Sequence, residues 1–78
     1  MARLNPLPAR KMVKILVRLG FEEIRVKGSH HFFFNPITRK TATVPIHGNE
    51  YLNVGILKEI LRDIDFSVEA YEKLRQEI

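Results

Sequence analysis

Hydrophobic residues near the start of the chain recur with the spacing of one face of an α-helix, i, i+3, i+4 and i+7. They are Met12, Ile15, Leu16 and Leu19. Pro8 stands before this run, where a first helical turn tolerates a missing N–H, and Gly20 stands after it as a stop signal. Lys11, Lys14 and Arg18 occupy another side of the same helix. The pattern therefore predicts an amphipathic helix with a basic face.

The middle of the chain changes to the period of two that is typical of β-strands. Three such segments cover residues 21–27, 30–35 and 41–44. In the first segment, alternation predicts that charged residues share one side and apolar residues the other. The charged residues are Glu23, Arg25 and Lys27, and the apolar ones are Ile24 and Val26. Because the connections between segments are short, we expect an antiparallel meander.

The last third of the chain returns to helical spacing. Asn53 and Ser67 are candidate N-caps of two further helices. Their predicted apolar stripes are Ile56, Leu57, Ile60, Leu61 and Ile64, and then Val68, Tyr71, Leu74 and Ile78. The order α-β-β-β-α plus a terminal helix predicts an α+β fold with helices on one face of a three-stranded antiparallel sheet. We expect one domain over residues 1–78, with residues 1–7 as an N-terminal arm.

Charge is distributed unevenly along a chain whose composition, 45% hydrophobic and 28% charged, is that of a globular domain. Residues 1–47 hold nine Lys or Arg and two acids, a balance of 9 − 2 = +7, whereas residues 48–78 hold four against seven, 4 − 7 = −3. A basic front half favours a polyanion such as nucleic acid. With no cysteine, disulfide scaffolds and thiol nucleophiles are excluded. No apolar run has the length of a membrane span or a secretory signal, so we expect a cytoplasmic protein.

Two adjacent histidines begin the second predicted strand. Alternation places His30 on the same side as Phe32 and Phe34, and His31 on the same side as Phe33. Burying two phenylalanines removes more apolar area than burying one, so the pattern alone slightly favours His31 as the outward residue. An exposed imidazole can exchange a proton near neutral pH. Two ordinary structural histidines, one half-buried and one on the surface, remain the alternative.

Other chemistries fit these residues less well. A metal site that uses His47 as a third ligand is not predicted, because adjacent strand residues diverge and no cysteine or carboxylate lies nearby in sequence. The absence of acids between Glu23 and Glu50 also argues against magnesium. A nucleophilic Ser29 lacks an elbow motif and an orienting acid. An exposed phenylalanine beside cations would suit stacking on single-stranded nucleic acid, or a patch covered by a protein partner.

Three motifs together resemble the HicA toxin family, the YcfA-like ribonucleases of toxin–antitoxin pairs. They are RVKGSHH at residues 25–31, TVPIH at 43–47 and GILKEILR at 55–62. Gly20-Phe21 and the segment DFSVE at residues 65–69 also fit. The resemblance extends over residues 7–70, with Ile56 a departure where the family commonly has threonine.

The resemblance implies a fold like a double-stranded-RNA-binding domain and an endoribonuclease that cuts mRNA without metal or cofactor. It implies neutralisation by a HicB-type antitoxin. The family's catalytic histidine falls on His30, and its aromatic position falls on Phe33. This would turn His31 and Phe33 inward and leave Phe32 and Phe34 outside, against the preference from hydrophobic area.

The expected contacts with RNA follow from the resemblance and from the charge of the chain. The residues are Arg25, Lys27, Gly28, Ser29, Phe32, Lys11 and Lys14. Lys27 and Arg25 would offset charge on a phosphate, and Gly28 would let the backbone approach it. Two alternatives remain open: a non-catalytic RNA-binding module of the same fold, and a domain whose basic face binds an acidic protein.

Overall fold

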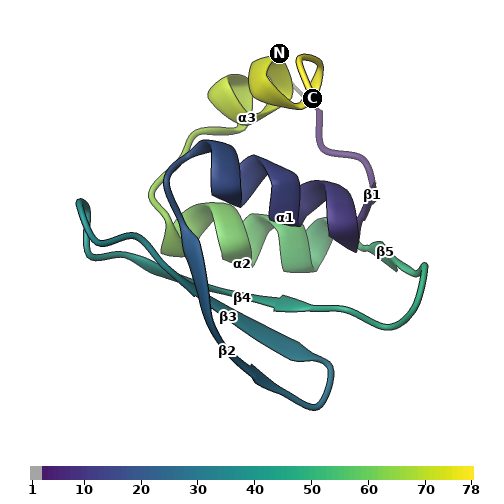
Figure 1. Ribbon diagram of the computed structural model, residues 1–78. Helices are drawn as coiled ribbons and strands as arrows, with labels where there is room; N and C mark the ends of the chain where they lie inside the picture. The colour runs from purple at the N-terminus through teal and green to yellow at the C-terminus, as the bar shows by residue number, and fades with distance from the viewer. Residues whose placement is uncertain (1–2) are drawn as a thin grey trace.

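A computed structural model describes residues 3–78, in which helices pack on one side of a three-stranded antiparallel sheet (Figure 1). The sheet has the order β2-β3-β4, and its strands are β2 (Glu22–Lys27), β3 (His30–Phe34) and β4 (Thr41–Pro45). The helices are α1 (Ala9–Arg18), α2 (Val54–Asp63) and α3 (Val68–Arg75). In Figure 1, α1 and α2 lie over the sheet, and α3 lies on their far side. The predicted α+β class and meander are confirmed. We call the sheet face toward α1 and α2 the inner face, and the opposite face the outer face.

The helix ends follow from local sequence. The Asn53 side chain accepts a hydrogen bond from the Ile56 N–H at 2.9 Å and caps α2, and the Ser67 hydroxyl accepts one from the Ala70 N–H at 3.1 Å and caps α3. Both predicted caps are confirmed. After α1, Gly20 adopts a φ of 97°, a left-handed conformation that favours glycine and turns the chain toward β2.

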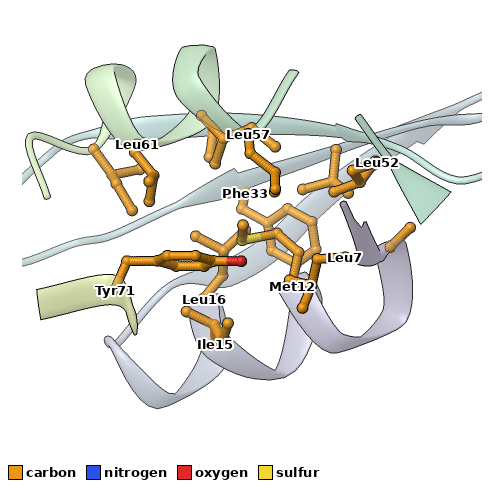
Figure 2. Packing of buried hydrophobic residues seen from close by; sticks show 14 of the residues in the cluster. Leu7, Met12, Ile15, Leu16, Phe33, Leu52, Leu57, Leu61 and Tyr71 are labelled. Carbon is orange, nitrogen blue, oxygen red and sulfur yellow. The ribbon is translucent and has the colours of Figure 1, made fainter. Parts of the chain in front are cut away.

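The core lies between the inner face and the helices. Its fully buried members with the largest side chains are Tyr71, Phe33, Met12, Ile15, Leu16, Leu57, Ile60 and Val44. Figure 2 shows Tyr71 extending from α3 toward Met12 and Leu16 of α1. Helix α3 therefore covers the side of the core that lies away from the sheet. Tyr71 points inward, as the periodicity predicts.

A second, two-stranded sheet is absent from the sequence prediction. It pairs β1 (Leu7–Pro8) with β5 (Tyr51–Leu52) in antiparallel register, Leu7 opposite Leu52. Leu7 is only 4% exposed and belongs to the core, so the last residue of the predicted arm is part of the folded body. The first two residues of that arm lie outside the described residues. Strands of two residues carry no periodicity, which is why the pattern did not reveal this pairing.

An irregularity in β2 corrects the predicted alternation of its charges. Glu23 pairs with Phe33 and Arg25 pairs with Phe32, so the register shifts at Ile24. Because successive residues of β3 point to opposite faces, Glu23 is on the inner face and Arg25 on the outer face. The prediction of one shared charged side was wrong, since a bulge inserts a residue and breaks the period of two.

Candidate active site

The central strand β3 separates its residues cleanly between the two faces. Phe33 is 1% exposed in the core, and the half-buried His31 lies opposite the buried Val44 with its Nδ1 atom 3.1 Å from the Glu23 carboxylate. His31 and Phe33 therefore face inward, and His30 faces outward. The orientation implied by the resemblance is confirmed, and the preference from hydrophobic area was wrong. The apolar area of the β3 side chains alone does not determine which of them face the core, because side chains from α1, α2 and α3 also fill that core.

The outer face presents three cross-strand rows. They are Lys27–His30–Pro45, Arg25–Phe32–Thr43 and Glu22–Phe34–Thr41. Lys27 thus lies directly opposite His30, at the distance at which cross-strand side chains interact. His30 is exposed, and within residues 3–78 its ring makes no side-chain hydrogen bond. An imidazole in this state is free to exchange a proton with a bound molecule.

A cation and an aromatic ring lie in the neighbouring row. The Arg25 guanidinium carbon is 5.7 Å from the centroid of the Phe32 ring, within the range of a cation–π contact. Phe32 and Phe34 are both half-buried, so their rings remain partly accessible. Accessible rings beside cations form the kind of surface on which nucleic acid bases stack.

His30 also borders a shallow groove of about 330 Å³ between β4 and α2. Thr43 and Pro45 line it from β4, and Glu59 and Asp63 line it from α2. His30 therefore lies between cations of β2 and carboxylates of α2. The sequence analysis missed these carboxylates, because only the packing of α2 beside β4 brings them near.

The turn that leads into β3 holds the remaining predicted residues. Gly28 has a φ of 61°, and a side chain placed there would meet no atom within 4 Å, so glycine is favoured by the backbone and the space above it is open. The Ser29 carbonyl accepts a hydrogen bond from the Ile46 N–H at 2.7 Å. The Ser29 hydroxyl lies 3.4 Å from Nε2 of His47. His47 is a neighbour of this site that the sequence analysis considered only as a metal ligand.

Two of the predicted RNA contacts lie elsewhere. Lys11 and Lys14 are on α1, which covers the inner face, so the structure does not bring them together with His30. Lys14 instead lines a hollow of about 350 Å³ with Glu23, His31 and Ile46. The predicted set is therefore divided between two sides of the sheet.

A comparison with known protein families identifies the family of this chain. The family model described as "HicA toxin of bacterial toxin-antitoxin" matches residues 9–66. The chain belongs to the HicA toxin family. The match runs from α1 through the complete β2-β3-β4 sheet and α2, and it ends before α3. This HicA protein is thus a toxin of a toxin–antitoxin system. A separate search of curated proteins finds no match.

Two further properties concern the described part of this HicA chain. No helix within residues 3–78 has the length and apolar character needed to cross a membrane. Over the same residues, no group of three or more His, Cys, Asp or Glu side chains is gathered in a way that could hold a metal ion.

Proposed function

We propose that this HicA toxin is a metal-independent endoribonuclease that cuts mRNA, with His30 as its acid–base residue. The observation that carries the proposal is the position of His30: exposed on the outer face, opposite Lys27 and beside the Arg25–Phe32 pair. An imidazole that can exchange a proton, next to cations that can hold a phosphate, is what RNA cleavage requires. The membership in a toxin family adds that the cleavage would harm the cell that contains it.

The reaction we propose is an internal transesterification. His30 takes the proton of the ribose 2′-hydroxyl while that oxygen attacks the adjacent phosphorus, and the bond from phosphorus to the 5′-oxygen breaks. The products are a 2′,3′-cyclic phosphate and a 5′-hydroxyl, which receives a proton as it leaves. Lys27 offsets the negative charge that develops on the phosphate, and the Gly28 backbone can approach it closely. The proposed step needs no metal ion, because His30 moves the proton and Lys27 offsets the charge on the phosphate.

Binding of the RNA would use the outer face around His30. Phe32 and Phe34 would stack on bases of a single strand, and Arg25 would contact its backbone. Ser29, in the turn before His30, would position the strand at the reactive bond. A HicB-type antitoxin would neutralise the toxin, and an mRNA substrate places its action in the cytoplasm.

A non-catalytic RNA-binding module is the second candidate. The contact of Arg25 with Phe32 favours it, because a cation beside an accessible ring binds nucleic acid without any chemistry. The two functions differ in one result, which is whether RNA is cut or only bound.

The test compares wild type with His30→Ala, in cells and with purified protein. Induced expression of wild type should arrest growth with loss of mRNA, and purified wild type should cut single-stranded RNA in the presence of a chelator. His30→Ala should reduce the cleavage rate by about 100-fold or more. Its far-UV circular dichroism and melting temperature should match wild type, because the removed side chain is exposed.

The outcomes separate the candidates. Equal cleavage by both proteins would contradict the assignment of His30. Growth arrest by both proteins, with RNA bound and left intact, would establish the non-catalytic module instead. Cleavage that stops in the chelator would contradict the metal-independent reaction.

A further inference from the structure

We propose that His47 is the second acid–base residue of this site, the group that protonates the 5′-oxygen as it leaves. The inference rests on the proposed ribonuclease function and adds a residue to it. Transesterification of RNA moves two protons, one from the 2′-hydroxyl and one to the departing 5′-oxygen. His30 can accept the first of them. The second calls for another group on the opposite side of the phosphate.

Backbone hydrogen bonds fix the chain at His47 next to the turn before β3. The pairing of β3 with β4 ends at His30 opposite Pro45. The bond of 2.7 Å from the Ile46 N–H to the Ser29 carbonyl extends this ladder by one step. On the far side, the Glu50 N–H donates to the His47 carbonyl at 3.0 Å. The chain is therefore held on both sides of His47, just past the end of β4.

The alternation of β4, continued past its end at Pro45, would give His47 the same side as His30. Val44 is in the core, Pro45 pairs with His30 on the outer face, and Ile46 lines the inner hollow beside His31. His47 lies two residues past the end of β4, and continued alternation would turn it outward again. On that side His30 and His47 would be diagonal neighbours, a relation that separates side chains on one face by about 7–8 Å. A phosphate group fits between two rings at that separation.

The ring of His47 has a partner that orients it. Its Nε2 atom lies 3.4 Å from the hydroxyl of Ser29, the residue immediately before His30. Both histidines are exposed, so both rings can meet a bound strand. Ser29 is in this view a positioning residue that links the two imidazoles.

The other titratable groups around His30 suit the role less well. Glu59 and Asp63 border the groove on the α2 side, and exposed carboxylates there would repel a phosphate. Lys27 is opposite His30, where an ammonium group holds charge on the phosphate and is not needed as a proton donor. An imidazole, which can be protonated or neutral near pH 7, fits the transfer of a proton to an alkoxide.

The test uses two RNA oligonucleotides that share one cleavage site. One has the natural 5′-oxygen as leaving atom, and the other has sulfur in its place, which departs as a thiolate without being protonated. We expect His47→Ala to cut the oxygen substrate about 100-fold more slowly than wild type and the sulfur substrate at nearly the wild-type rate. His30→Ala should be slow on both substrates. Asn49→Ala, an exposed change in the same loop, should leave both rates unchanged.

The outcomes test the role of His47 separately from the proposed ribonuclease function. If wild type cuts neither oligonucleotide, both the ribonuclease function and the role of His47 are contradicted. If wild type cuts both and His47→Ala cuts the oxygen substrate at the wild-type rate, only the role of His47 is overturned. Equal slowing of His47→Ala on both substrates also overturns it, because a leaving-group acid is not needed for sulfur. Melting curves of each variant exclude loss of the fold as the cause.

Discussion

The two faces of β3 carry the same residue types and have different environments. On the inner face, Phe33 is 1% exposed and the His31 ring is bound to the Glu23 carboxylate at 3.1 Å. On the outer face, His30 is exposed, and Phe32 lies under the Arg25 guanidinium. The difference shows that residue type does not determine which histidine is available for chemistry. The neighbouring elements engage the inner pair in the fold and leave the outer pair accessible, with His30 exposed and Phe32 accessible in part.

The largest expected effect on stability comes from removing the Phe33 ring from the inner face. Phe33→Ala should lower the free energy of unfolding by about 3–5 kcal/mol, because it removes a fully buried ring and leaves a cavity. Phe32→Ala, the matched change on the outer face, should cost less than half as much. Denaturant titration measures both. If Phe33→Ala is unfolded in water, Phe33→Leu, with an expected loss of about 1–2 kcal/mol, allows the same comparison. Equal losses at Phe32 and Phe33 would contradict the asymmetry of the faces.

A smaller effect on stability, of opposite sign, is expected at Tyr71, which α3 contributes to the core. Unlike the His31 ring, the buried Tyr71 hydroxyl has no hydrogen-bond partner within residues 3–78. An unpaired buried hydroxyl costs about 1–3 kcal/mol, so Tyr71→Phe should raise the free energy of unfolding by about 1 kcal/mol or more. A lower melting temperature for the variant would show that the hydroxyl contributes a bond in solution.

The same substitution has a dependence on pH that can be measured in the same titration. Burial raises the pKa of the Tyr71 phenol. Above about pH 10 the unfolded chain ionises this group while the folded chain keeps its proton, so the wild type loses stability as pH rises. Tyr71→Phe has no such group. The stability difference between the two proteins should therefore widen from neutral pH to about pH 11.

The smallest effect is expected at the contact between Glu23 and His31 on the inner face. Glu23 and His31 are 43% and 24% exposed at their side chains, and exposed pairs contribute about 0–1 kcal/mol. Glu23→Gln should lower the free energy of unfolding by less than about 1 kcal/mol and leave RNA cleavage unchanged, because the pair faces away from His30. Denaturant titration and a cleavage assay check the two parts. A strong loss of cleavage would show that the two faces of β3 are coupled.

The sequence predicted the elements of this fold where local patterns determine them. Asn53 and Ser67 cap their helices as expected, because an N-cap depends only on the residues beside it. The three strands of the meander also occur where alternation placed them. The bulge at Ile24 and the buried Leu7 were missed, since both depend on pairing with distant residues.

The candidate site was predictable in part. His30 came from the resemblance to HicA toxins, and its orientation required the cross-strand register with Lys27 and Pro45. The approach of His47 to Ser29 could have been inferred, because an antiparallel pair places the end of one strand beside the start of the other. The approach of Glu59 could not, because no local pattern tells where α2 packs.

The position of β3 in the middle of the sheet has a consequence for how this toxin would be controlled. Its backbone is hydrogen-bonded to β2 on one side and to β4 on the other, so His30 can move only by rotation about its own side-chain bonds. In the proposed complex, the ordering entropy of binding would then fall on the RNA and hardly on the protein. If His30 acts as proposed, the toxin would need no rearrangement of β3 and would be competent as soon as it has folded. An antitoxin that occupies the outer face would then be the means of restraining the proposed activity.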